Sequence, residues 1–422
     1  MSRIPVETSG VTPHMARTDG AWPLLSSEAH RMMFFFGALQ AVAAIAWWTI
    51  DLGGRYLGLY QPIPWSVPPM WAHAWLLLYG LFPFFMFGFL MTAGPNWLGA
   101  PKTSGAAFVP AASLMAGGLL LFYSGIAIHR GVTAAGLLLH AAGWLWGLAA
   151  LVRMLARHWN ASARYALMVF AFLALGLTGD ALFAAAVATE RYDLVETVLH
   201  GAVWFFLLPV FVGVSARMVP FFSSRVLGPD VDYRPLWARP VLMGGAIAHG
   251  LLELSAMSQW LWAVDLPLAG AVAFLAWRWG LARSGRVRLL AVLHLSLGVL
   301  ALALLLSGAM SAAMALGALE RIGLAPLHLL VIGYFAAMTL GMVSRVSLGH
   351  SGRPLEADML TWCCYLGVLL AAALRLLGEF ARGMPLGSVV MLASALAWLG
   401  AFGVWAWRYV PMYVRPRVDG RR

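Results

Sequence analysis

Apolar stretches of about 20 residues recur along this chain, from about residue 31 to residue 410. A helix of that length crosses the hydrocarbon core of a bilayer, and helices satisfy their own backbone polar groups there. The chain is 62% hydrophobic and 11% charged, whereas a soluble domain is about a quarter charged. These features exclude a water-soluble globule and predict an all-α polytopic membrane protein.

Glycine and proline residues divide the apolar sequence into twelve predicted spans. Their approximate bounds are 31–50, 70–95, 106–127, 132–153, 164–188, 194–215, 236–256, 259–281, 287–314, 324–344, 359–380 and 385–410. We therefore expect a single twelve-helix transmembrane domain over 31–410. A polar N-terminal tail (1–30) precedes it and a basic C-terminal tail (411–422) follows it.

The basic residues predict the orientation of these spans. Most of the 28 Lys and Arg residues belong to the two termini or to the even-numbered loops. The opposite side holds only Arg55, Arg130, Arg191, Arg321 and Arg382, while Arg375 lies within a span. Because basic residues collect on the cytoplasmic side, both termini are expected to be cytoplasmic. The net charge of +11 is thus a feature of topology, and no nucleic-acid partner is implied.

Three histidines recur at nearly equal intervals. His73, His200 and His328 are 127 and 128 residues apart, and each opens a long apolar span, namely the second, sixth and tenth. The last two copies also share the spacing of a later Gly and Arg: His200, Gly213, Arg217 and His328, Gly341, Arg345. This pattern predicts three four-helix units around a pseudo-threefold axis. The alternative is a coincidence among apolar helices.

The predicted depth of the histidines separates candidate ligands from the others. In the twelve-span topology the outer half of the membrane contains five of them: His73, His140, His200, His249 and His328. His294 falls in the inner half, and His30, His158 and His350 fall on the cytoplasmic side. An intramembrane histidine can be a hydrogen-bonded packing residue, but several at one depth favour metal or haem ligation.

The residue types indicate which cofactors fit. Imidazole is the expected axial ligand of a b-type haem and also a good copper ligand, and the absence of a CxxCH sequence excludes covalently attached haem. Glu253 follows His249 by four residues and shares its helix face. Because burying a carboxylate costs about 2.5–3.5 kcal/mol, Glu253 is expected to have a partner, a metal or a proton to handle. It is the candidate catalytic residue.

Further charged residues are assigned lesser roles. Asp180 lies in the outer third of the fifth span. Like Glu253, it is a carboxylate buried in the membrane and is expected to have a partner. Arg382 could reach a haem propionate, because a guanidinium binds such a planar group with two hydrogen bonds. Arg375 and Glu379 are interpreted as a helix-end ion pair. Few ionisable residues lie in the inner half, so any protons consumed are expected to arrive from outside.

Three stretches resemble the NnrS family of bacterial membrane proteins. They are Trp71-Ala72-His73 with the later Gly88-Phe89-Leu90-Met91-Thr92-Ala93-Gly94-Pro95-Asn96-Trp97; Arg217-Met218-Val219-Pro220-Phe221-Phe222; and Arg345-Val346-Ser347-Leu348-Gly349-His350-Ser351-Gly352-Arg353-Pro354-Leu355 after His328. The resemblance implies a haem- and copper-containing protein of the nitric oxide response in the bacterial inner membrane. The cytoplasmic motif with Arg345, His350 and Arg353 has no metal-like convergence of its own, and we interpret it as a structured turn.

The predicted architecture also resembles the catalytic subunit of haem-copper oxidases and nitric oxide reductases. By position, the resemblance implies haem at His73 and His328 and a second metal at His200 and His249. The chain departs from that pattern, because Trp204 stands where a Tyr or Glu is expected one turn after His200. The paired histidines of the seventh and tenth helices are also missing, so the usual oxygen-reducing site cannot be assembled.

The leading hypothesis is a haem-binding inner-membrane protein of nitric oxide metabolism or tolerance. His73 and His328 would hold a b-type haem in the outer half of the membrane, and His200, His249 and Glu253 would hold copper or non-haem iron. Its partners would be nitric oxide, the lipid bilayer and a membrane or periplasmic electron donor. The site could bind nitric oxide only, or reduce it as an oxidoreductase of the nitric oxide reductase type.

Two other classes of protein remain as alternatives. A transporter or chaperone for haem or metal would use the same histidines transiently, and broken helices near the membrane midplane would be expected. A purely structural membrane subunit would hold no cofactor at all. Haem that survives purification in stoichiometric amount would separate the leading hypothesis from both.

Overall fold

The computed structural model describes residues 20–420, which form helices joined by non-helical connections and contain no strand. Residues 1–19 of the predicted N-terminal tail and residues 421–422 of the C-terminal tail lie outside this range. Within the rest of the predicted N-terminal tail, Ala21–Leu25 form a short helix and a long helix begins at Ala29. The last helix ends at Tyr413, three residues beyond its predicted end.

The helical elements follow one another with short connections. In chain order they are α1 (Ala21–Leu25), α2 (Ala29–Arg55), α3 (Pro69–Leu78), α4 (Phe82–Leu98), α5 (Gly105–Ile128), α6 (Arg130–Arg157), α7 (Ala163–Thr189), η1 (Tyr192–Leu194), α8 (Val195–Gly201), η2 (Ala202–Leu207), α9 (Leu208–Leu227), η3 (Pro229–Val231), α10 (Ala238–Leu254), η4 (Ser258–Trp260), α11 (Trp262–Arg278), α12 (Leu281–Ser284), α13 (Arg288–Ala315), α14 (Ala325–His328), η5 (Leu329–Ala336), α15 (Ala337–His350), α16 (Met359–Phe380) and α17 (Pro385–Tyr413). Of the η elements, η2 and η5 are π-helices and the others are 3-10 helices.

Ten helical segments of the described chain are long and apolar enough to cross a membrane. They coincide with the first six and the last four predicted spans, so the chain is an all-α polytopic membrane protein. The seventh and eighth predicted spans correspond to α10 and α11, which are 17 residues long each. At 1.5 Å per residue such a helix is about 25 Å long, a little short of the hydrocarbon core.

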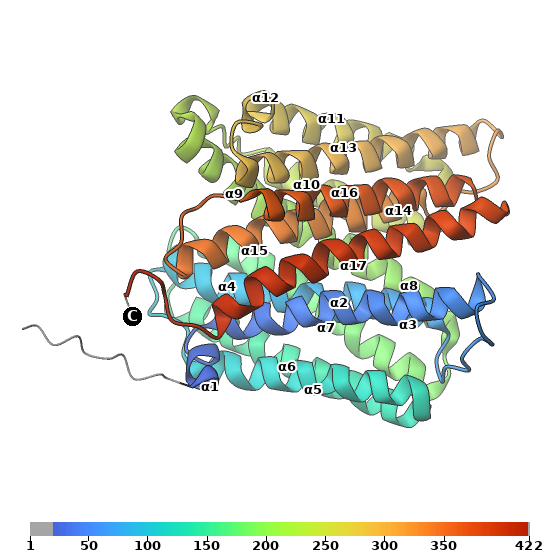
Figure 1. Ribbon diagram of the computed structural model, residues 1–422. Helices are drawn as coiled ribbons and strands as arrows, with labels where there is room; N and C mark the ends of the chain where they lie inside the picture. Colours follow the sequence, from blue (N-terminus) through green and yellow to red (C-terminus); the bar gives the residue numbers. More distant parts are fainter. Residues whose placement is uncertain (1–19, 421–422) are drawn as a thin grey trace, which may run out of the picture.

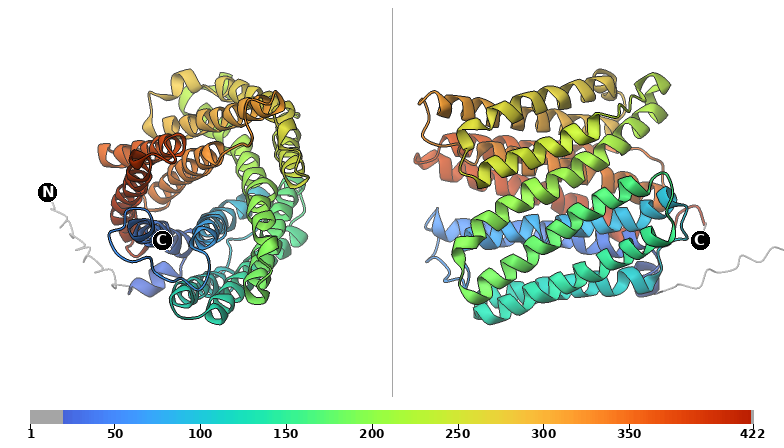
Figure 2. Two further views of the ribbon diagram at one scale, coloured as in Figure 1. Left: turned by 90° about the vertical axis from the view of Figure 1, so that its right-hand side faces the viewer. Right: turned by 180° about the vertical axis from the view of Figure 1, so that it is seen from behind.

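The helices run side by side in one bundle (Figures 1 and 2). The histidine-bearing segments α3, α8 and α14 lie at one end of it, and α1 and the last turns of α17 lie at the other (Figure 1). At that second end the Arg31 guanidinium donates hydrogen bonds to the carbonyls of Tyr413 (3.2 Å) and Arg415 (3.0 Å). Hydrogen bonds thus join the start of α2 to the end of α17.

The predicted second and tenth spans form the interior of the bundle. In both Pro69–Leu98 and Ala325–His350, 83% of the most apolar stretch is buried inside the protein, against 33–61% in the other eight segments. A helix buried on all sides contacts protein, whereas a half-buried one turns the rest of its surface to lipid. Two of the three repeated histidines are therefore carried by the most enclosed helices.

The helix is irregular shortly after each repeated histidine. His200 is followed by the π-helix η2 and His328 by the π-helix η5. After His73, α3 ends at Leu78, and the backbone N–H of Gly80 bonds to the carbonyl of Trp75, five residues back, at 2.9 Å. Single π-turns of this kind are frequent at functional sites.

A buried glutamine provides a hydrogen bond to a backbone carbonyl that the break after α3 leaves without its helical partner. Since Gly80 bonds to Trp75, its N–H is not available to the carbonyl of Leu76, and the side-chain amide of Gln40 donates to that carbonyl instead (3.1 Å). The Tyr123 hydroxyl in turn donates to the Gln40 side-chain oxygen (3.0 Å). Freed backbone groups inside a membrane need such partners, because no water replaces them.

Candidate metal and cofactor site

His200, Glu253 and His249 come together at the end of the bundle that carries α3, α8 and α14. Glu253 is placed between the two imidazoles: its Oε2 lies 2.9 Å from Nδ1 of His200 and 4.0 Å from Nε2 of His249. The three residues come from two helices, because His200 belongs to α8 and the other two to α10. The i, i+4 spacing of His249 and Glu253 gives them the shared face that faces α8. Two imidazoles and one carboxylate are a donor set for copper, iron or zinc.

Asp265 supports this cluster from α11. Its Oδ1 lies 2.7 Å from Nδ1 of His249, and both side chains are buried. A carboxylate can only accept here, so Nδ1 of His249 carries the proton and Nε2 is free to ligate. Metal-binding histidines are commonly oriented and made more basic in this way. The other oxygen of Asp265, Oδ2, is buried without a hydrogen-bond partner.

Aromatic packing also fixes the His249 ring. Trp204, in the π-helix η2, stacks on it with the ring centroids 3.4 Å apart. Imidazole nitrogens bind in the plane of the ring, so a stacked indole leaves them free. The ligand atoms of His200, Glu253 and His249 are not all within 4.8 Å of one another. Among the described residues, Glu28, His30 and His350 meet that criterion. A single ion held by His200, Glu253 and His249 would therefore require a side-chain movement, for which the half-buried His200 has room.

His73 and His328 lie within electrostatic range of one another. Nδ1 of His328 donates to the carbonyl of Leu324 (2.9 Å), which again leaves Nε2 as the free nitrogen. Nδ1 of His73 is buried without a hydrogen-bond partner. The His73 ring stacks on Trp48 at 4.0 Å between centroids, and Arg55 covers the same indole at 5.1 Å. The unpartnered nitrogen fits an imidazole that has a ligand to hold.

Two arginines, one in α16 and one just after it, place positive charge near this histidine pair. Arg375 and Arg382 both lie within electrostatic range of His328. Both guanidiniums also contact Glu379, at 2.8 Å from Arg375 and 2.6 Å from Arg382. The predicted Arg375–Glu379 ion pair is present, and Glu379 occupies guanidinium groups that a propionate would also use.

His140 belongs to a separate polar network and does not join either group above. Its Nδ1 lies 2.8 Å from Oδ2 of Asp180, and Trp75 donates from Nε1 to the other Asp180 oxygen at 2.7 Å. All three side chains are fully buried. The buried carboxylate of Asp180 thus has the partners its cost requires. Nε2 of His140 has none.

Within the described part of the chain, His294 interacts with neither histidine group nor with the His140 network. Its Nε2 is 3.0 Å from the Ser223 hydroxyl, and its Nδ1 has no partner. Neither residue contacts the other histidines through any hydrogen bond or ion pair given by the described chain. Among the described residues, His294 is thus a buried histidine with a single hydrogen-bond partner, Ser223.

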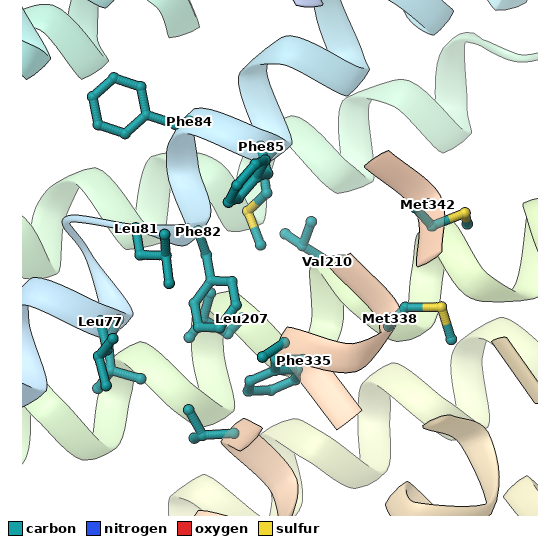
Figure 3. Packing of buried hydrophobic residues seen from close by; sticks show 14 of the residues in the cluster. Leu77, Leu81, Phe82, Phe84, Phe85, Leu207, Val210, Phe335, Met338 and Met342 are labelled. Atoms are coloured by element: carbon teal, nitrogen blue, oxygen red, sulfur yellow. The ribbon is translucent and has the colours of Figure 1, made fainter. Parts of the chain in front are cut away.

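An apolar cavity of about 60 Å³ lies where the continuations of the three histidine-bearing helices meet. Some of its lining residues are drawn in Figure 3. Its lining includes Phe82 and Phe85 of α4, Val210 and Phe211 of α9, and Met338 and Met342 of α15. Phe82, Val210 and Met338 follow His73, His200 and His328 by nine, ten and ten residues. Water needs only about 10–15 Å³, but an apolar cavity stays dry and takes apolar molecules.

Two groups of polar residues escaped the sequence interpretation. Asp265 stands in an apolar stretch, and that alone is a signal of an intramembrane functional residue. Glu28 and His30, at the start of α2, meet His350, at the end of α15, with one ligand atom from each within 4.8 Å of the others. His350 is thus not the isolated turn residue that the cytoplasmic motif indicates.

Comparison with known protein families agrees with the sequence motifs. The family model described as NnrS protein matches residues 24–417, nearly the whole described chain. Comparison with the curated proteins gives no match. The matched range includes both histidine groups, the π-helices and the apolar cavity. This chain therefore belongs to the NnrS family of membrane proteins.

Proposed function

We propose that this chain is a haem-binding protein of the bacterial inner membrane that acts in nitric oxide metabolism or tolerance. It would cross the membrane twelve times, with α10 and α11 as the two short spans and both termini in the cytoplasm. The repeated helix irregularity after His73, His200 and His328 supports the three-unit arrangement. The observation that carries the proposal is the convergence of His200 and His249 on Glu253, backed by Asp265.

His73 and His328 are the proposed haem ligands. The unpartnered Nδ1 of His73 and the free Nε2 of His328 fit an imidazole-ligated iron. Arg375 and Arg382, which now contact Glu379, would instead bind the haem propionates. When bound, the haem would supply an iron that exchanges electrons and that could bind nitric oxide where one of the two histidines is displaced.

His200, His249 and Glu253 are the proposed ligands of a second metal, copper or non-haem iron. Asp265 would keep His249 in the tautomer that presents Nε2, and Trp204 would hold the ring in place. His200 would complete the site by turning toward the other two residues. Because the outer metal position has both imidazole and carboxylate donors, the donor set favours a first-row transition metal over Mg²⁺ or Ca²⁺.

Glu253 is proposed to handle protons. A row of titratable groups leads to it from the surface: Glu196 is exposed, its Oε1 lies 3.9 Å from Nε2 of His200, and Nδ1 of His200 lies 2.9 Å from Glu253. While no metal is bound to His200, its imidazole could take a proton on one nitrogen and release it from the other. Protons would thus enter from the end of the bundle opposite the termini.

Nitric oxide would reach the site through the apolar interior. The cavity lined by Phe82, Val210 and Met338 is large enough for a diatomic gas. If the gas is reduced, a membrane or periplasmic electron donor must supply the electrons. Conversion of two nitric oxide molecules to nitrous oxide and water would consume two electrons and two protons, so the protein would then be an oxidoreductase of the nitric oxide reductase type.

A transporter or chaperone for haem or metal is the second candidate. The interruption between α3 and α4, at Tyr79–Leu81, is the observation in its favour, because substrate sites of transporters often lie at broken helices. The two candidates differ in how firmly the histidines hold their cargo. A transporter would release haem or metal during purification, whereas a gas-binding protein would keep it.

Absorption spectra of the detergent-purified protein test the proposal. The protein should be prepared from haem-sufficient cells and measured oxidised and dithionite-reduced, with and without nitric oxide, alongside haem and metal quantification. We expect a b-type spectrum that shifts with nitric oxide and a haem content near one or more per chain. A colourless protein would contradict haem ligation and favour the transporter or a structural role. Nitrous oxide release in the presence of reductant would separate turnover from binding.

A further inference from the structure

A second group of metal-type ligands lies at the opposite end of the bundle, beside the termini. Glu28 and His30 belong to the start of α2, and His350 is the last residue of α15. One carboxylate oxygen, Oε2 of Glu28, lies 3.3 Å from Nδ1 of His30 and 3.3 Å from Nδ1 of His350. The two imidazole rings are 4.3 Å apart between centroids.

These distances fit the spacing of ligands around a metal ion, and at the same distance Nδ1 of His350 forms a hydrogen bond with Oε2 of Glu28. Metal–ligand bonds of 2.0–2.1 Å at tetrahedral angles separate neighbouring ligand atoms by about 3.3–3.4 Å. A charge-assisted hydrogen bond between nitrogen and carboxylate oxygen is normally about 2.7–2.9 Å long. The distances from Oε2 of Glu28 to Nδ1 of His30 and to Nδ1 of His350 are both 3.3 Å, which matches the separation of metal ligands.

His30 provides an independent observation. Its side chain is 3% exposed, and within the described residues its Nδ1 has no hydrogen-bond partner, although it lies 3.3 Å from Oε2 of Glu28. An unpaired polar atom in such a buried position is costly unless something binds it. Glu28 immediately precedes α2, yet its carboxylate makes no capping hydrogen bond to that helix. Its two oxygens instead contact the two histidines and Lys102.

The surrounding chain holds the three residues in place. The Arg417 guanidinium donates to the carbonyl of His350 (3.0 Å), and the N–H of Val418 donates to the carbonyl of Ser351 (3.0 Å). The C-terminal segment thus fixes the turn that carries His350. The C-terminal end of α15 also presents the negative end of its helix dipole toward the site.

We propose that Glu28, His30 and His350 bind one divalent transition-metal ion of the zinc and copper class. Glu28 and His350 are partly exposed, so the ion would keep an open position for water and would exchange with the medium, unlike a closed structural site. Lys102 competes for this site, since its ammonium lies 3.2 Å from Oε1 of Glu28. The Lys102 side chain is 87% exposed and can swing into solvent when the ion binds.

Metal titration of the full-length protein tests the site. The protein should carry no polyhistidine tag and should contain His249→Ala, which removes the proposed second-metal site at the other end. After chelation and dialysis, Zn²⁺ is titrated against a competing indicator, and Co²⁺ is added separately to record the visible d–d absorption of the ligated ion. We expect one high-affinity Zn²⁺ per chain and a Co²⁺ spectrum of imidazole and carboxylate ligation.

Three variants and one control variant decide the assignment. His350→Ala and Glu28→Gln should each weaken Zn²⁺ binding by more than the roughly 10–100-fold that loss of an outer-sphere partner costs. Lys102→Gln alters an exposed side chain and should strengthen binding by about tenfold, because it removes a nearby positive charge. His158→Ala, which removes a histidine outside the cluster, should change nothing. Absence of binding in the parent, or equal affinity in folded His350→Ala, Glu28→Gln and Lys102→Gln, would overturn the proposal.

Discussion

Nδ1 of His249 lies 2.7 Å from Oδ1 of Asp265, and both side chains are buried between α10 and α11. This contact determines the protonation of the other ring nitrogen, Nε2. With its Nδ1 proton donated to Asp265, His249 turns an unprotonated Nε2 toward Glu253, 4.0 Å away. Three helices thus cooperate in one polar site, because His200 of α8 meets the same carboxylate.

Asp265→Asn tests this orientation. The amide keeps a hydrogen-bonding oxygen but loses the negative charge that makes His249 basic, so the affinity for a second metal should fall about 10- to 100-fold. Metal content and affinity are measured after chelation and reconstitution. Asp193→Asn, at an exposed aspartate paired with Arg191, is the control and should leave affinity unchanged. Equal affinity in both variants would show that Asp265 has only a packing role.

Glu253→Gln tests proton handling. The amide keeps the size of the side chain but cannot take up a proton, so nitric oxide turnover, if present, should fall about 100-fold or more while haem content is retained. Nitrous oxide production and the haem spectrum are measured on the same preparation. Glu356→Gln, at an exposed glutamate, serves as the control. Loss of haem in Glu253→Gln, or turnover equal to the parent's, would contradict this role.

Gln40→Leu tests the hydrogen bond from the Gln40 amide to the backbone carbonyl of Leu76, next to the break between α3 and α4. It removes the donor to the Leu76 carbonyl and leaves that group unsatisfied in the bundle interior, which costs about 1–3 kcal/mol. The midpoint of thermal unfolding in detergent should fall, whereas Gln61→Leu, at an exposed position, should not lower it. An unchanged midpoint in Gln40→Leu would mean that water or another group reaches the carbonyl.

Gly80→Ala tests the same break from the backbone side. A β-carbon at Gly80 would lie 2.8 Å from the Leu76 carbonyl oxygen and 3.2 Å from the Gln40 amide nitrogen, whereas one at Gly400 would meet nothing within 4 Å. Because backbone cannot move aside cheaply, Gly80→Ala should destabilise the protein by about 1–3 kcal/mol. Gly400→Ala should be neutral or slightly stabilising. Equal unfolding midpoints for the two variants would contradict the close packing at the break.

Asp358 provides a prediction about pH. It caps α16, and its Oδ1 accepts from the N–H of Thr361 at 2.8 Å. Burial alone would raise the pKa of Asp358, but the Thr361 hydrogen bonds and Arg408 together lower it below 3.8. A carboxyl group with a lowered pKa stabilises the fold at neutral pH, and this contribution is lost as the pH falls through the lowered value.

Two variants separate the cap of α16 from the charge of Asp358. Asp358→Ala should cost about 0.5–2 kcal/mol at pH 7, because the cap is lost. Asp358→Asn should cost less, because asparagine caps about as well, and it should lack the acid-dependent part of the stability. Thermal unfolding midpoints in detergent at pH 7 and below pH 3.8 measure both effects. An Asn variant as acid-sensitive as the parent would assign the loss to other groups.

The sequence was sufficient for the positions of ten spans and for the shared helix face of His249 and Glu253. The contact of Glu253 with His200 depends on how α8 packs against α10. Hydrophobic length predicts a span directly, and an i, i+4 pair shares a helix face wherever the helix goes. The family resemblance was also confirmed. Twelve spans, the three-unit arrangement and the orientation of the termini are not settled by helix length, so they stay predictions.

Other features depend on tertiary contacts that no local pattern encodes. Glu28 and His350 are 322 residues apart, and only the return of α15 to the start of α2 brings them together. The π-helices η2 and η5 have no compositional signature, because they differ from α-helices in one hydrogen-bond step. Asp265 was visible as an acidic residue in an apolar stretch, but its partner depended on how the connection after α10 turns.

The haem content of His73→Ala and His328→Ala, read from reduced-minus-oxidised spectra and quantified per chain, tests the central claim most directly. His158→Ala is the matched control, because it removes a histidine outside both proposed sites. The account predicts that each of the first two variants loses haem or shows an altered ligand spectrum, and that His158→Ala keeps the parent's b-type spectrum and its shift with nitric oxide. Full haem retention with unchanged spectra in both His73→Ala and His328→Ala would contradict it.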